Sequence, residues 1–304
     1  CFVHTGAAPT PPEVSRFLWR GLAVHVTDLY GSTEMGPVTI NGKVHDYIQY
    51  RLVDRPQLGF RLTDKPYPRG ELAVKSPRAT TGYYNNPKAT ENLHHDGYLL
   101  TGDIVEERAP GQLVWLDRRQ NVLRLAHGEF VNASRLEELF WSQSPFIEQA
   151  YLYGNPLYSY LLAVLVPSAA AVERAGDSTE QRALLRQELA RVAAQAGLKS
   201  HESPRDFLLE SAPFSQENGL LSSSNKPRRP HLKTAYGPRL DELYLEIEKR
   251  QKGRLADPGL SLPDKLREAV ALTLGLESVE TGSSSFVHLG GDSLAAVRLS
   301  ELLR

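Results

Sequence analysis

The spacing of apolar residues divides the chain into regions of different secondary structure. Up to about Trp115, short apolar runs are separated by Gly and Pro, as in VHVTDLYGSTEMGPVTI and DGYLLTGDIVEER, which predicts strands joined by tight turns. Within this region PPEVSRFLWRGL is the one segment predicted to be a helix, with Pro at its start.

From Asp117 onward, strands and helices alternate. NVLRLAHGEFVNASRLEELFWSQS predicts a strand, a turn at His127–Gly128 and a helix from about Ser134. IEQAYLYG and YLLAVLVPS then read as strands, and DSTEQRALLRQELARVAAQAGL as a helix capped by its Asp and Ser. These elements predict a compact α+β unit.

The last part of the chain is predicted to be a loop, a helix, a linker and a further helical unit. NGLLSSSNKPRRPHLKTAYG is polar and rich in serine, and PRLDELYLEIEKRQ has helical spacing. KGRLADPGLSLP has the composition of a linker, and a final helical unit starts near Leu262.

Composition narrows the class of protein. The 304 residues are 41% hydrophobic and 23% charged with a net charge of −1, so bulk charge favours neither nucleic acid nor an anionic membrane as a partner. No apolar run approaches the roughly 20 residues of a membrane span. The single cysteine, Cys1, excludes an internal disulfide, so a reducing, cytoplasmic location is expected. We expect both ends of the chain to be cuts through domains.

One short turn has the side chains of a nucleotide–metal site. Gly31, Ser32 and Thr33 would present backbone N–H groups and hydroxyls to a phosphate. Glu34 follows with a carboxylate suited to Mg²⁺, and Tyr30 precedes with a flat face for a purine. The alternative is a hairpin turn with incidental hydroxyls.

Three further residues are candidates on weaker grounds. Asp103 follows Gly at a strand end, where a carboxylate can accept hydrogen bonds from a ribose diol, although a plain turn has the same pattern. Arg118 lies next to Arg119 and is equally compatible with a surface ion pair. Lys226, in the serine-rich loop, could bring a point charge to a carboxylate or phosphate, or remain solvated.

The chain ends with FVHLGGDSLAAVRLSELLR, in which an amphipathic helix is predicted to begin at Gly-Gly-Asp-Ser. Ser293 opens it after two glycines and an aspartate, a placement typical of a site where a group is attached. The alternative is a helix start capped by Asp292, with Ser293 merely exposed. The nine histidines show no ligand spacing.

The order of these motifs resembles the adenylate-forming superfamily followed by a carrier protein. LDRRQNVLRLAHGEFVNASRLEELF and ENGLLSSSNKPRRPHLKTAYGPRLDELY are most similar to the adenylation domain of carboxylic acid reductases. The implied fold class is α/β and α+β multidomain. The implied domains are the end of a large adenylation domain (1–116), a small mobile α+β subdomain (117–250), a linker (251–261) and the start of a helical carrier domain (262–304).

The resemblance also implies the chemistry. A carboxylic acid attacks the α-phosphate of ATP, giving an acyl-adenylate and pyrophosphate, and the thiol of 4′-phosphopantetheine then takes the acyl group. A phosphopantetheinyl transferase would load the carrier, and an NADPH-dependent reductase domain absent from this chain would follow it. Implied roles are as follows: Gly6, Ala7 and Ala8 line the adenine and acyl pocket; Tyr30 lies near the base; Gly31 and Ser32 contact the nucleotide; Thr33 meets the α-phosphate; Glu34 binds Mg²⁺; Asp103 and Arg118 hold the ribose; Gln120 is the hinge; Gly128 borders the thiol route; Lys226 bridges carboxylate and phosphate; Ser293 carries the phosphopantetheine.

Three departures from the family pattern are visible. The Gly- and Ser/Thr-rich phosphate loop expected upstream is absent, Gln120 replaces the usual hinge Asp or Lys, and His288 stands where an acidic residue is common. We therefore expect that this chain cannot adenylate by itself. A peptide-synthetase module, a stand-alone acyl-CoA ligase and a non-catalytic carrier scaffold remain as alternatives.

Overall fold

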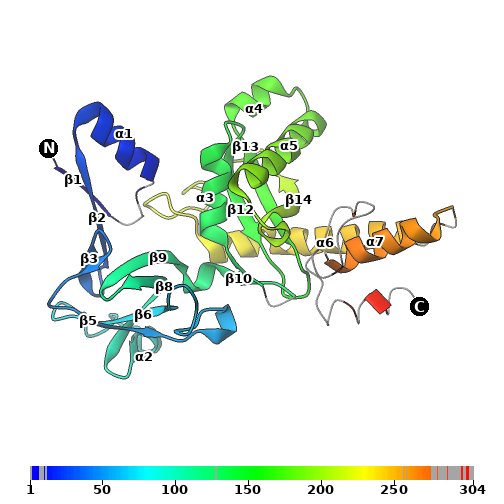
Figure 1. Ribbon diagram of the computed structural model, residues 1–304. Coiled ribbons are helices and arrows are strands. Elements are labelled where there is room, and N and C mark those ends of the chain that lie inside the picture. The colour runs from blue at the N-terminus through cyan, green and yellow to red at the C-terminus, as the bar shows by residue number, and fades with distance from the viewer. Residues whose placement is uncertain are drawn as a thin grey trace. The chain divides into compact units, whose positions relative to one another are not determined.

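The computed structural model describes residues 2–6, 10, 12–126, 129–255, 257 and 259–274, with isolated positions at 279, 286, 296, 299 and 300. The chain forms two compact units, Cys1–Gln120 and Asn121–Arg304 (Figure 1). The division falls four residues after the boundary expected at residue 116, since β9 (Gln112–Arg118) pairs within the first unit.

The first unit is built on one nine-stranded sheet in the order β1-β2-β3-β4-β9-β8-β6-β5, with β7 paired to β8. Its strands are β1 (Phe2–Gly6), β2 (His25–Ser32), β3 (Gly36–Ile40), β4 (Lys43–Val44), β5 (Gln49–Val53), β6 (Arg69–Lys75), β7 (His94–His95), β8 (Tyr98–Ala109) and β9. Only β1 and β2 pair in parallel among the described strands of this sheet. Helix α1 (Pro12–Leu22), which the sequence predicted, lies between them in the chain. The buried core of this unit includes Val38, Leu72, Val74 and Val105.

A short helix in this unit was not expected from the sequence. Helix α2 (Pro87–Leu93) begins at the N-cap Asn86, whose side chain accepts a hydrogen bond from the backbone N–H of Ala89. Asn at the N-cap and Pro at the first helical position are the local signals that favour this start. Two short 3₁₀ turns are also present: η1 (Pro56–Leu58) lies within this unit, and η2 (Arg119–Asn121) lies at its end.

The second unit is a three-stranded mixed sheet covered by helices on both faces (Figure 1). Its elements are the β10–β11 hairpin (Val122–Arg124, Phe130–Asn132), α3 (Ala133–Gln143), β12 (Ile147–Tyr153), β13 (Leu161–Pro167), α4 (Ala169–Arg174), α5 (Ser178–Ala196), the 3₁₀ turn η3 (Ser200–Glu202), β14 (Pro204–Leu209), α6 (Arg229–Leu255) and α7 (Leu262–Leu274). The expected strands and the helices α3 and α5 are confirmed. Asp177 caps α5 by accepting from the backbone N–H groups of Thr179 and Glu180.

The central strand β13 shows why both faces are covered. Leu161, Ala163 and Leu165 pack with α3 and α5, whereas the alternate residues Leu162 and Val164 pack with α6. Because side chains alternate across a strand, a wholly apolar run requires apolar cover on each side.

Helix α6 corrects one expectation. The sequence predicted a loop up to Gly237 and a linker from residue 251, but α6 runs without interruption from Arg229 to Leu255 and contains Pro238. A proline inside a helix costs about 3 kcal/mol. Burial of Leu232, Leu240 and Leu243 at helical spacing offsets this, since each such side chain contributes about 1.5–3 kcal/mol.

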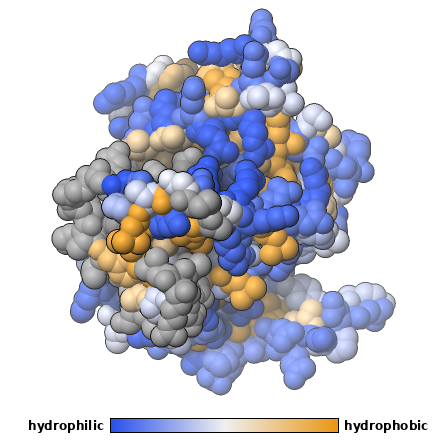
Figure 2. All heavy atoms as spheres, turned by 90° about the vertical axis from the view of Figure 1, so that its right-hand side faces the viewer, coloured by the Kyte–Doolittle hydropathy of each residue, from blue (hydrophilic) through white to orange (hydrophobic). Residues whose placement is uncertain are grey.

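Hydrophilic side chains predominate on the face drawn in Figure 2, and the hydrophobic ones lie among them in small groups. Of the helices in the described part of the chain, none has the length and apolar content that would let it cross a membrane.

Candidate active site

The side chain of Asp103 contacts three other side chains. It lies on β8 opposite Arg118 of β9, and its side chain accepts from the Tyr30 hydroxyl (2.7 Å) and from the Trp115 indole N–H (3.2 Å). The Arg118 Nε lies 3.1 Å from the same oxygen that Trp115 contacts, Oδ1. Asp103 is only 3% exposed. Burial of a carboxylate in this way requires such partners, because an unpaired buried charge is costly.

The local backbone conformation explains the Thr-Gly-Asp sequence at residues 101–103. The Asp103 N–H donates to the Thr101 hydroxyl (3.0 Å), which itself donates to the Leu72 carbonyl (2.9 Å). Gly102 between them has φ +72°, a left-handed conformation that glycine adopts without strain. The motif therefore turns the Asp103 carboxylate toward β2 and β9.

Tyr30 on β2 has its hydroxyl committed to this carboxylate. Burial, followed by the negative charge of Asp103 and the hydrogen bond to it, raises the pKa of Tyr30 well above its ordinary value. The phenol therefore stays protonated and donates. Gly6, at the end of β1, pairs with Leu29, so the end of β1 lies alongside the strand that carries Tyr30.

The second cluster is the turn between β2 and β3. The Ser32 hydroxyl donates to Glu34 Oε2 (2.6 Å), and the Tyr83 hydroxyl donates to Glu34 Oε1 (2.8 Å). The bond from Ser32, with smaller contributions from Tyr83, the backbone and Arg118, lowers the pKa of the Glu34 carboxyl. Thr33 is exposed at the tip of the turn. This arrangement presents an ionised carboxylate beside two hydroxyl-bearing residues.

Gly31 is required for the shape of this turn. A Cβ at position 31 would lie 2.3 Å from the Gly36 carbonyl oxygen and 2.9 Å from the Pro37 Cα, both backbone atoms. No side chain fits such an approach without displacing the main chain, so the Gly-Ser-Thr sequence is explained by close packing of β2 against β3.

Arg118 links the two clusters electrostatically. Its positive charge adds to the lowering of the Glu34 pKa, and it opposes the larger effect of burial that raises the pKa of Tyr30 and Tyr83. The Arg118 side chain is about half exposed. The sequence grouped Tyr30, Ser32 and Glu34 in one turn, and the fold brings this turn together with Asp103 and Arg118, which were proposed separately.

Sequence reasoning missed Tyr83 and Trp115. Tyr83 follows Gly82 in the turn-rich segment TTGYYNNP, and that signal could have identified it as a residue presented by a loop. Trp115 had no comparable local signal, because its role depends on the pairing of β8 with β9.

The remaining predicted residues belong to other segments of the chain. Lys226 is exposed in the loop that precedes α6, and Gln120 lies in η2. Ala7, Ala8, Gly128, His288 and Ser293 fall outside the described residues. Among those that are described, no cluster of three or more His, Cys, Asp or Glu could enclose a metal ion.

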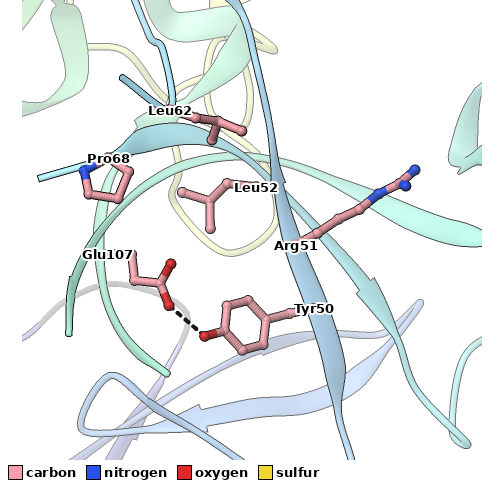
Figure 3. A pocket seen from close by; sticks show the side chains of 6 residues that line it. All are labelled: Tyr50, Arg51, Leu52, Leu62, Pro68 and Glu107. Carbon is pink, nitrogen blue, oxygen red and sulfur yellow. Dashed lines mark hydrogen bonds between the residues drawn. The ribbon is translucent and has the colours of Figure 1, made fainter. Parts of the chain in front are cut away.

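A separate hollow of about 530 Å³ lies on the first unit, with lining residues Tyr50, Arg51, Leu52, Leu62, Pro68 and Glu107. Figure 3 shows the Tyr50 hydroxyl directed at Glu107, while the Arg51 side chain points away from the other five. None of its lining residues was predicted for the site.

Similarity to known proteins extends over both units. A family model described as "Phosphopantetheine attachment site" matches residues 264–304, a span that includes Ser293. Carboxylic acid reductases of Segniliparus rugosus and Mycobacterium tuberculosis are 42% and 44% identical over 98% of this chain and 26% of their own length.

A solved structure agrees with these relatives. The A-PCP didomain of the Segniliparus rugosus carboxylic acid reductase, in complex with AMP, is 41% identical, with a TM-score of 0.78 over 99% of this chain and 43% of that one. The chain spans about a quarter of the length of the curated relatives. By sequence and by fold, the chain is similar along nearly its whole length to the part of carboxylic acid reductases that joins the adenylation domain to the phosphopantetheine carrier region.

Proposed function

We propose that this chain takes part in ATP-dependent activation of a carboxylic acid and in transfer of the acyl group to a carrier. A carboxylate oxygen attacks the α-phosphorus of ATP and pyrophosphate leaves. A thiol then attacks the acyl carbon, AMP leaves, and the thiol proton is released. Catalysis of the first step consists mainly of positioning and charge neutralisation.

One observation carries the proposal: Arg118 lies against Asp103 and its charge also acts on Glu34. A nucleotide needs a hydrogen-bond partner for its ribose and compensation for the negative charge of its phosphates. Asp103, Arg118 and Glu34 together can provide both. The AMP complex of the Segniliparus rugosus didomain supports the same assignment.

The carboxylate proposed to bind the ribose already has several hydrogen-bond partners. Asp103 already accepts from Tyr30, Trp115 and Arg118, so a ribose diol that bonds to Oδ1 must displace Arg118. Arg118 has the freedom to move because about half of its side chain is exposed, and its guanidinium can then donate to the ribose itself. Tyr30, with Gly6, Ala7 and Ala8, is assigned to the adenine side.

Mg²⁺ fits Glu34 by the chemistry of the donor set. Mg²⁺ in nucleotide sites is held by one or two carboxylates, substrate phosphates and waters, so a single ionised carboxylate suffices. Each Glu34 oxygen keeps acceptor capacity beyond its hydrogen bond from Ser32 or Tyr83. Bound there, the ion would neutralise phosphate charge, while Thr33, Gly31 and Ser32 would contact the phosphates.

The second unit would supply most of the remaining parts. Lys226 would place a positive charge between carboxylate and phosphate during adenylation. Gly128 would border the path of the thiol, and Gln120, at the division between the units, would be the hinge. Ser293 would carry 4′-phosphopantetheine, which supplies the thiol, after loading by a phosphopantetheinyl transferase. An NADPH-dependent reductase domain would follow on the full-length cytoplasmic protein.

The test compares two carboxylates on one strand. Asp103 and Glu107 both lie on β8 and each accepts from a tyrosine hydroxyl, Tyr30 or Tyr50. In the full-length protein, Asp103→Asn should raise the KM for ATP and lower acid-dependent ATP–pyrophosphate exchange by about 10-fold or more. Glu107→Gln should leave both near wild type. Equal effects from the two variants would overturn the assignment.

A further inference from the structure

The loop that carries Lys226 is closed by its own hydrogen bonds. The Ser222 N–H donates to the Lys226 carbonyl (2.9 Å), and the Lys226 N–H donates to the Ser222 hydroxyl (3.1 Å). Just outside this turn, the Arg228 N–H donates to the Leu220 carbonyl (2.9 Å). The backbone of the lysine is therefore ordered locally, although its side chain is exposed.

Three residues further on, the first residue of α6 fixes this loop to the core. Arg229 donates through one guanidinium nitrogen to Glu137 Oε1 on α3 (2.6 Å) and through another to the Leu152 carbonyl on β12 (2.7 Å). The Leu152 N–H in turn donates to the same Glu137 oxygen (2.6 Å). One arginine, one glutamate and one peptide unit thus form a closed ring of hydrogen bonds.

This ring occupies the outer edge of the sheet. Strand β12 pairs only with β13 in the order β12-β13-β14 of the described strands, so the outward N–H and C=O of Leu152 have no strand there to pair with. Arg229 and Glu137 satisfy them in place of a strand. Both side chains are nearly buried, at 11% and 10% exposed, and the guanidinium stacks over the Tyr151 ring at 5.0 Å.

We propose that Arg229 and Glu137 are positioning residues for Lys226. This inference rests on the proposed function, since it assigns these residues to the same adenylation step. Three residues span at most about 10 Å, so the lysine backbone cannot shift far while Arg229 stays in place. Breaking a buried ion pair is strongly unfavourable, and that resistance fixes the base of the loop.

The side chain of lysine is long and flexible, which makes the position of its backbone decisive. A mobile ammonium contributes as a point charge only where its Cα is held within reach of the reacting atoms. An ordinary surface loop would not provide this. The ring at Leu152 connects the loop to α3 and β12, the elements that also build the core of the unit.

The experiment is a double-mutant cycle in the full-length protein. Single-turnover adenylation is measured as acid-dependent pyrophosphate release, and acyl transfer is measured separately from supplied acyl-adenylate. Lys226→Ala should lower adenylation by about 100-fold or more. Arg229→Lys, which keeps the charge but loses the two-pronged geometry, should lower adenylation about 10-fold and leave transfer much less affected.

The decisive result is the double variant. If Arg229 acts through Lys226, adding Arg229→Lys to Lys226→Ala should cause no further loss. Additive losses, or equal losses in both half-reactions, would overturn the proposal. Glu137→Gln, which keeps an acceptor for the Leu152 N–H, should reproduce the effect of Arg229→Lys without unfolding the unit.

A matched control lies on α5. Arg191 donates to Glu188 (2.8 Å) and to the Gln143 carbonyl (2.7 Å), which is the same kind of pairing in the same unit. Arg191→Lys should leave adenylation unchanged, and an effect as large as that of Arg229→Lys would mean that general loosening of the unit is the cause. If Lys226→Ala does not change the rate of adenylation, the proposed function fails. If only the Arg229 variants leave that rate unchanged, this inference alone fails.

Discussion

The Tyr83 hydroxyl donates a 2.8 Å hydrogen bond to Glu34 although 49 residues separate the two in sequence. A second contact joins the same loops, since the Thr80 N–H donates to the Glu34 carbonyl (2.7 Å). The carboxylate proposed as a metal ligand is therefore held by a loop that belongs to a different part of the sheet.

This contact predicts a pH-dependent effect of Tyr83→Phe. Ser32 is the largest cause of the lowered Glu34 pKa and Tyr83 contributes further, so the variant should bring the pKa back toward 4.5. Because the folded-state pKa lies below the unfolded one, the stabilisation is present above pH 4.5 and is lost as pH falls through the folded-state value. Thermal unfolding should show the variant to be less stable than wild type at neutral pH, with the difference shrinking as the pH falls below 4.5.

The neighbouring tyrosine is the control for that prediction. Tyr84 is 94% exposed, and Tyr84→Phe should leave the unfolding temperature unchanged both at neutral pH and in acid. A loss of stability in Tyr83→Phe that is equally large in acid would show that its hydroxyl does not act through the Glu34 charge.

Gly31→Ala should destabilise the protein by about 1–3 kcal/mol, because the added methyl group would collide with the main chain at Gly36 and Pro37. Gly21→Ala is the comparison, since that glycine is in α1 with open space around its Cβ position, and alanine there should stabilise by about 0.5–1 kcal/mol. Denaturant unfolding measures both. A tolerated Gly31→Ala would contradict the packing of β2 against β3.

Gln120→Pro should separate the two half-reactions. Gln120 lies in η2 at the division between the two units, and proline fixes its φ near −65°. If the units rotate about this residue, the variant should spare adenylation and depress transfer to the pantetheine thiol. Gln120→Ala is the control, and wild-type rates in both half-reactions of the proline variant would place the hinge elsewhere.

Ser293 should be the residue that receives 4′-phosphopantetheine. It lies within the matched span 264–304 and follows Gly-Gly-Asp at a predicted helix start, where free N–H groups favour a phosphate. Intact mass of the full-length protein after incubation with CoA and a phosphopantetheinyl transferase measures the addition. Ser293→Ala should abolish it and Ser285→Ala should not; addition to Ser293→Ala would contradict the assignment.

Much of the fold could be predicted because its signals are local. The apolar run of β13 indicated a strand, and Asp177 marked the start of α5. The start of α6 was predicted wrongly because Pro238 and the polar residues before it favour a loop, whereas burial of Leu232 and Tyr236 against the sheet favours a helix. Tertiary burial outweighed local propensity there.

By itself, the sequence determined which residues could do chemistry and in what order they occur: a hydroxyl- and carboxylate-bearing turn at Glu34, a Thr-Gly-Asp bend at Asp103 and a loop lysine at Lys226. Only the tertiary structure decided which of them meet. Tyr30 reaches Asp103 across 73 residues and Arg229 reaches Glu137 across 92. Such pairs depend on strand order, register and the burial of charge, and these properties arise only when segments distant in the chain pack together.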